Sequence, residues 1–162
     1  MTVLTVERLR ELLHYDPETG VFTWTLQPRR RALPRGNVAG TVQRGRVQII
    51  IDQKSYRAHR LAWLYMKGEW PSNEIDHIDG NGLNNKFGNL RDVSTKVNQQ
   101  NKRRPKAGTH LGVQGVNKVY RRFRAKLHVE GRSLHLGYFS TPEEAHAAYV
   151  CAKRQLHAGC TI

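Results

Sequence analysis

Apolar and polar residues alternate most regularly in the last third of the chain. Every second residue from Phe123 to Val129 is apolar, and the residues between them are Arg, Lys or His. This period of two is typical of a β-strand with one buried face and one exposed basic face. The turn signal Glu130-Gly131 follows, and apolar residues then alternate again at 134, 136 and 138. We therefore predict a β-hairpin over residues 122–139.

A helical period follows this hairpin. Thr141 suits the N-cap, Pro142 suits the first helical position, and Glu144 is spaced for a capping box. An apolar stripe with helical spacing comes next, formed by Ala145, Ala148, Tyr149, Ala152 and Leu156. With another strand predicted at Leu111–Val116, we expect a small three-stranded antiparallel sheet packed on one helix.

The first hundred residues show shorter patterns, in which helical and strand periods are mixed. Val6, Leu9 and Leu12 recur at helical spacing after Thr5, which suits the N-cap. A second helix is predicted over 60–67, and a third begins at 94 or 95 and runs through 101. Strands are predicted at 21–24, 47–51, 56–59, 74–78 and 90–93. This mixture predicts an α+β fold.

Basic residues are in large excess over acidic ones. The chain has 27 Lys and Arg against 13 Asp and Glu, which gives a formal net charge of +14. The excess is spread over most of the chain, because residues 27–107 carry 17 basic and 6 acidic groups and residues 108–162 carry 8 and 3. Such a charge favours a polyanionic partner, with nucleic acid the leading candidate. Arg29, Arg30 and Arg31 lie in a predicted loop and either contact phosphates or form a solvated charge run.

The remaining composition excludes several classes of protein. The first twenty residues have charged groups among their apolar positions, and no apolar run approaches membrane-spanning length. We therefore expect a cytoplasmic protein with no membrane partner and no small-molecule substrate. Cys151 and Cys160 are too few for a disulfide scaffold or a four-Cys zinc site. They either form a metal cluster with His157 or are ordinary reduced thiols.

The stretch E-I-D-H-I-D-G-N-G-L-N-N-K-F-G-N-L, residues 74–90, combines residues that suit phosphodiester hydrolysis. That reaction needs an activated water, charge neutralisation at the phosphate and help for the departing oxygen. The Asp76 carboxylate suits a hard cation such as Mg²⁺, and a neutral imidazole at His77 suits removal of a proton from water. Adjacent strand residues point to opposite faces, so one of the two must turn toward a partner across the loop. The alternative is an ordinary hairpin whose Asp, Gly and Asn residues only form turns.

The segments D-H-I-D-G-N, N-N, G-N-L-R and V-N-Q-Q-N, in this order, resemble the HNH (ββα-metal) endonucleases. The resemblance is greatest to the phage homing type, in which asparagine replaces the last histidine, and it covers about residues 46–101, including H-R-L at 59–61. It implies that His77 is the general base, that Asp76 and Asn98 bind a divalent metal, and that Asn89 braces the loop and helps to orient His77. Mg²⁺ is the expected metal, and Mn²⁺ is also suitable.

Other polar residues of this segment have simpler interpretations. Turn formation explains Asp79, Asn81, Asn84 and Asn85, so no catalytic role is assigned to them. His59 either assists the site or has a structural packing or capping role.

The segments L-G-V, R-A-K-L, L-G-Y-F and T-P-E-E-A-H-A-A-Y, between residues 111 and 149, resemble the apetala-type or ethylene-response-factor DNA-binding domain. The resemblance implies a sheet that lies in the DNA major groove. The DNA contacts that it implies are Arg121, Arg122, Arg124, Lys126 and Arg132. Leu111 and His135 depart from the family, which usually has arginine and tryptophan at these positions.

Together these patterns predict a ββα-metal HNH nuclease domain at 1–101 with an N-terminal helix and hairpin extension, a basic linker at 102–108, and an apetala-type domain at 109–162. We expect a monomeric, metal-dependent homing-type endonuclease that nicks double-stranded DNA in the cytoplasm of a phage-infected bacterium. The alternatives are a non-catalytic, sequence-specific DNA-binding regulator and a protein that binds or cuts RNA.

Overall fold

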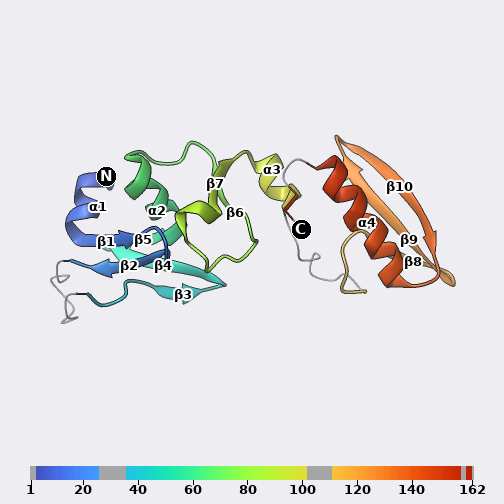
Figure 1. Ribbon diagram of the computed structural model, residues 1–162, viewed down its shortest axis with the longest axis horizontal. Helices are drawn as coiled ribbons and strands as arrows, with labels where there is room; N and C mark the ends of the chain where they lie inside the picture. Colours follow the sequence, from blue (N-terminus) through green and yellow to red (C-terminus); the bar gives the residue numbers. More distant parts are fainter. Residues whose placement is uncertain (1–2, 26–35, 102–110, 158–159, 162) are drawn as a thin grey trace. The chain divides into compact units, whose positions relative to one another are not determined.

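The computed structural model describes residues 3–25, 36–101, 111–157 and 160–161 (Figure 1). It contains both helices and strands, which confirms the predicted α+β class. The chain divides into two compact units, residues 1–94 and 95–162, whereas the sequence predicted a first domain that extends through residue 101. The predicted linker, 102–108, and the loop arginines Arg29, Arg30 and Arg31 lie outside the described residues. Among the described helices, none is long and apolar enough to cross a membrane.

The first unit begins with a capped helix followed directly by a hairpin. Helix α1, Val6–Leu12, starts where the Thr5 hydroxyl accepts a hydrogen bond from Arg8 N at 3.3 Å. Strand β1, Leu13–Asp16, pairs antiparallel with β2, Val21–Trp24. The sequence did not predict β1, because Leu13 continues the helical stripe of α1 and the chain changes conformation without a turn signal.

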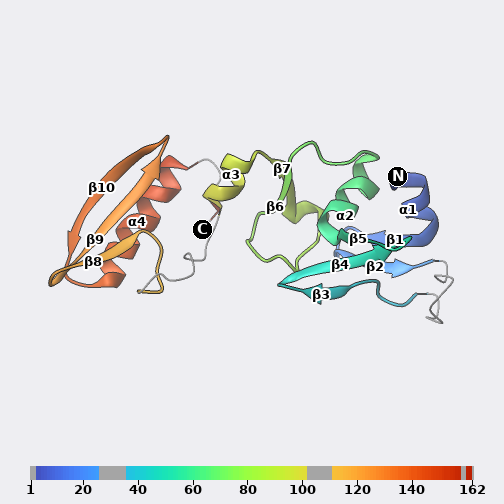
Figure 2. The same cartoon turned by 180° about the vertical axis from the view of Figure 1, so that it is seen from behind.

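A three-stranded antiparallel sheet and a second helix follow. Strands β3, Thr41–Gln43, β4, Arg46–Ile51, and β5, Lys54–Arg57, pair in the order β3-β4-β5. Helix α2, Ala58–Lys67, begins immediately after β5, so His59 lies in the helix and not in the strand that the sequence predicted there. Figure 2 shows these elements from behind.

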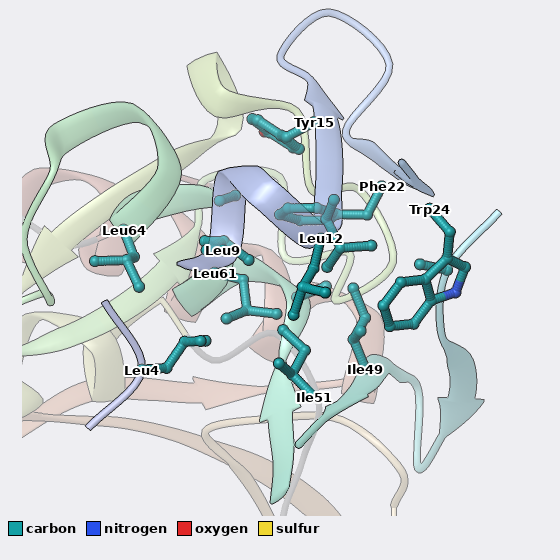
Figure 3. Close-up of a cluster of buried hydrophobic side chains, with 14 of the residues drawn as sticks. Leu4, Leu9, Leu12, Tyr15, Phe22, Trp24, Ile49, Ile51, Leu61 and Leu64 are labelled. Atoms are coloured by element: carbon teal, nitrogen blue, oxygen red, sulfur yellow. The ribbon is translucent and has the colours of Figure 1, made fainter. Parts of the chain in front are cut away.

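The core of the first unit joins α1, α2, the β1–β2 hairpin and β4. Figure 3 shows side chains from all four parts gathered in one cluster. Leu9, Leu13 and Leu61 are fully buried, and burial of each such side chain contributes about 1.5–3 kcal/mol. Ile75 and Leu90 extend this cluster into the next hairpin, so the segment with the Asp-His pair is anchored on the main core.

That hairpin consists of strand β6, Glu74–His77, and strand β7, Leu90–Val93. The two strands are antiparallel, with Asp76 opposite Arg91 and His77 opposite Leu90. The connecting loop ends in a short 3₁₀ helix, η1, at Phe87–Asn89.

The second unit contains α3, Thr95–Gln100, and a sheet of β8, Val116–Val119, β9, Arg122–Val129, and β10, Arg132–Phe139. Helix α4, Pro142–Leu156, lies against this sheet and has the predicted capping box between Thr141 and Glu144. The strand predicted at Leu111–Val116 is wrong, because β8 starts only at Val116. Gly115 has φ +74° and lies against the Tyr149 ring, so the chain turns there and cannot yet be extended.

A register shift between His135 and Gly137 changes the faces of β10. The sequence predicted that residues 134, 136 and 138 share one apolar face. Instead, Leu134 lies opposite Leu127, whereas Tyr138 lies opposite Arg124 and is 48% exposed. A β-bulge inserts one residue, and a single insertion reverses the face of every residue beyond it.

Candidate active site

Asp76 and His77 are adjacent on β6, and both side chains are buried. Arg91 reaches Asp76 from the opposite strand: its Nε and Nη2 donate hydrogen bonds to Asp76 Oδ2 at 3.0 and 2.8 Å. The ion pair compensates a carboxylate that burial would otherwise destabilise. No local sequence pattern marks Arg91 as the partner of Asp76. The cross-strand register, which follows from the length of the loop, was the signal that could have identified it.

His77 has a hydrogen bond to Asn85, whose Oδ1 lies 3.2 Å from His77 Nε2. An amide oxygen only accepts, so in this pair Nε2 carries the proton and Nδ1 is the basic nitrogen of the neutral ring. Turn formation was the role predicted for Asn85; its Nδ2 does donate to Leu83 O at 3.3 Å within the loop, but its Oδ1 also contacts His77. Asn85 is buried and is itself held by Tyr15, whose hydroxyl donates to Asn85 O at 2.6 Å. No sequence pattern links Tyr15 to this loop, because the two residues are far apart in the chain.

Asn89 holds the two ends of the same loop together. Its Oδ1 accepts from Asp79 N at 3.0 Å, and its Nδ2 donates to Asp79 Oδ1 at 3.0 Å and to Asn84 O at 2.9 Å. Burial alone would raise the pKa of Asp79, but hydrogen bonds from Asn84, Asn81 and Asn89 bring it below its ordinary value. Asp79 therefore remains a charged acceptor that organises the loop.

His59 lies beside His77, with ring centroids 5.1 Å apart and an interplanar angle of 75°. Its side chain is buried, and its Nδ1 has no hydrogen-bond partner among the described residues. Such a buried polar atom destabilises a fold by about 1–3 kcal/mol. Burial, together with the nearby His77 ring and the positive charges of Arg46, Arg60 and Arg57, lowers the pKa of His59 to about 3.

Burial also lowers the pKa of His77, although its hydrogen bond with Asn85 opposes part of this shift. Because the pKa of each histidine lies below its ordinary value, both imidazoles are neutral near pH 7. A neutral His77 is in the protonation state that a general base needs.

The residues expected to bind a metal lie in different units. Asp76 belongs to the first unit, and Asn98 lies on α3 in the second. In the part of the chain that the structure describes, no three His, Cys, Asp or Glu side chains gather as a metal site, and this includes Cys151, His157 and Cys160. The donor types at Asp76 and Asn98 still fit a hard cation, because Mg²⁺ accepts few protein oxygens and keeps several waters.

The basic residues predicted to contact DNA lie in or beside β9 of the second unit. Arg121, Arg122 and Arg132 are exposed, and Arg124 and Lys126 are partly buried. Two rings of β10 lie opposite this basic row: His135 pairs with Lys126 before the bulge, and the bulge brings Tyr138 opposite Arg124. The His135 and Tyr138 ring centroids are 4.9 Å apart. The sequence pattern predicted Tyr138 on the apolar face instead, because the bulge has no clear sequence signal.

Comparisons with known proteins find a nuclease family match over the segment that contains the candidate site. A family model described as HNH endonuclease matches residues 56–100, the segment that contains Asp76, His77, Asn85 and Asn89. Protein 3.8 of Escherichia phage T7 is 37% identical over 82 residues, which cover 49% of this chain and 67% of that protein. No solved structure matches the chain. The chain therefore belongs to the family of Protein 3.8 of phage T7 and contains an HNH endonuclease domain at residues 56–100.

Proposed function

We propose that this protein is a divalent-metal-dependent HNH endonuclease of the homing type, which nicks double-stranded DNA and is guided by a DNA-binding second unit. The observation that carries the proposal is the arrangement of His77, which lies next to Asp76 and whose Nε2 is hydrogen-bonded to Asn85 Oδ1. This arrangement lies within the segment that matches the HNH endonuclease family.

His77 would act as the general base. Its Nδ1 would accept a proton from the attacking water, while Nε2 continues to donate to Asn85 Oδ1. The Asn85 acceptor would hold the ring in one tautomer and would stabilise the imidazolium that forms, because a charged donor strengthens the hydrogen bond. Tyr15 and Asn89 would keep the loop, and therefore Asn85, in place.

Asp76 and Asn98 would hold the divalent metal. When bound, Mg²⁺ or Mn²⁺ would neutralise charge at the scissile phosphate and at the leaving 3′ oxygen. A single carboxylate predicts modest metal affinity and a broad choice of divalent ions.

The second unit would bind the DNA backbone and adjacent bases. Support comes from the row of Arg122, Arg124 and Lys126 on one face of β9, beside the rings of His135 and Tyr138. Basic side chains of this kind contact phosphates, and aromatic rings stack on bases or sugars. We propose that the protein acts as a monomer, and one active site per monomer favours nicking over double-strand cleavage.

A plasmid-nicking assay with His77→Ala tests the catalytic assignment. We expect a decrease of about 10²–10⁴-fold in the nicking rate, because general base catalysis contributes factors of this size. His14→Ala is the matched control, since His14 is an exposed histidine of the same unit. Circular dichroism must show that both variants are folded.

Equal nicking by His77→Ala and the wild type would contradict the assignment. Salt-sensitive DNA binding without any cleavage in Mg²⁺ or Mn²⁺ would instead identify a non-catalytic DNA-binding regulator.

A further inference from the structure

Asp76 and Arg91 form an ion pair that is built into the β6–β7 hairpin. The two residues are direct cross-strand partners, so their side chains extend from the same face of the hairpin. Two hydrogen bonds from Arg91 end on one carboxylate oxygen, Asp76 Oδ2. The Asp76 side chain is 8% exposed and that of Arg91 is 25% exposed. Water therefore screens this pair less than it screens an ordinary surface ion pair.

Two cations would compete for the single charge of Asp76. A divalent metal bound to this carboxylate would lie within a few ångströms of the Arg91 guanidinium, and like charges repel strongly where water is largely excluded. The other proposed ligand, Asn98, is neutral and cannot offset this repulsion. The positive charge of Arg91 cancels the negative charge of Asp76, so Asp76, Asn98 and Arg91 together carry no net charge.

We infer that Arg91 is a positioning residue that serves as the counter-cation of Asp76 and lowers the affinity of the free site for a divalent metal. The inference rests on the proposed function, because it requires Asp76 to be the metal ligand. It also predicts that DNA binding promotes metal binding. A DNA phosphate next to Asp76 supplies the missing negative charge, so the metal binds more tightly when DNA is present.

Calorimetric titration of the metal-free protein with Mn²⁺ tests this inference without any measurement of cleavage. We expect Arg91→Gln to bind Mn²⁺ at least ten times more tightly than the wild type, because the repelling charge is gone. Arg91→Lys keeps the charge and should bind Mn²⁺ about as weakly as the wild type. Arg8→Gln is the matched control, since Arg8 also pairs with acidic side chains, Glu11 and Asp52, in the same unit. It should leave the Mn²⁺ affinity unchanged.

A second measurement does not depend on the folding of Arg91→Gln. His77→Ala, which is expected to cut DNA at least about 10² times more slowly than the wild type, is titrated with Mn²⁺ alone and in the presence of a short duplex, with the heat of the duplex alone subtracted. We expect the duplex to tighten Mn²⁺ binding at least tenfold.

The outcomes separate this inference from the proposed function. Equal or weaker Mn²⁺ binding by Arg91→Gln would overturn the inference and leave Asp76 as a metal ligand, and so would a duplex that has no effect. If no variant binds Mn²⁺, with or without DNA, the metal role of Asp76 fails and the inference fails with it.

Discussion

The candidate functional residues of the two units differ in how deeply they are buried and in the size of the core that supports them. In the first unit, Asp76, His77 and Asn85 are buried beside a core that joins two helices and several strands. In the second unit, the fully buried cluster is formed by Val116, Ala125 and Ala145, and the basic residues lie on or near the exposed face of a small sheet. A base that must point at one atom needs a rigid support, whereas phosphate contacts tolerate variation in side-chain position. We therefore expect core changes in the first unit to affect chemistry and surface changes in the second to affect binding.

The largest expected effect comes from Gly20, which packs the β1–β2 turn against the loop of the candidate active site. Gly20 has φ +74°, and a Cβ there would collide with the backbone of Asn85 and Lys86. Gly20→Ala should therefore push away the residue that holds His77. We expect a loss of about 3 kcal/mol or more in the free energy of unfolding, measured by urea denaturation, and loss of nicking.

Gly131→Ala is the matched control in the second unit. Gly131 also has positive φ, +80°, but nothing lies within 4 Å of the position that a Cβ would take. Only the backbone strain remains, so we expect a loss of about 1–2 kcal/mol in stability and normal nicking. Equal effects of the two substitutions would contradict the view that the turn supports the active site.

The next largest effect is expected at His59, whose buried Nδ1 finds no hydrogen-bond partner within the described part of the chain. His59→Phe removes the unpaired nitrogen and keeps a planar ring against His77, so the free energy of unfolding should rise by about 1 kcal/mol at pH 7. The pKa of His59 is about 3 in the folded protein and near its ordinary value of 6.5 when unfolded. As the pH falls below 6.5, the unfolded wild type therefore gains a proton that the folded protein does not bind, and stability decreases.

The variant lacks this pH dependence, so its advantage should grow by about 2 kcal/mol between pH 7 and pH 5. Urea denaturation at the two pH values measures the difference. A constant difference would show that His59 titrates normally in the folded state.

Local sequence signals predicted the elements that have their own start and stop residues. Helix α4 begins with the predicted capping box at Thr141 and Glu144, and α1 begins after the predicted cap at Thr5. The alternation of β9 likewise indicated its buried and basic faces. These features depend on residues close together in the chain, so local patterns are sufficient to predict them.

Features that depend on distant contacts were not predictable in this way. The hydrogen bond from Tyr15 to Asn85 and the fit of Gly20 against the same loop form only when the β1–β2 hairpin packs on residues 85–87. Arg91 meets Asp76 only because the loop between β6 and β7 sets the register. In the second unit, the bulge in β10 moved Tyr138 to the basic face. The residue types of the site were therefore predictable, but their partners required the tertiary structure.

The smallest expected effect concerns Arg122 at the exposed face of the second unit. If Arg122 contacts one phosphate, Arg122→Gln should reduce the slope of log affinity against log salt concentration by about 0.9, which is about eightfold in affinity at 0.1 M salt. Arg154→Gln, on α4, removes the same charge from an exposed position outside the sheet and should leave the slope unchanged. Fluorescence anisotropy with a labelled duplex, in the absence of metal, measures both slopes. Nicking at saturating DNA should be normal in both variants, because the proposed general base, His77, belongs to the other unit. A lower rate at saturation in Arg122→Gln would instead mean that the second unit takes part in the chemistry, and the division of roles between the two units would then be wrong.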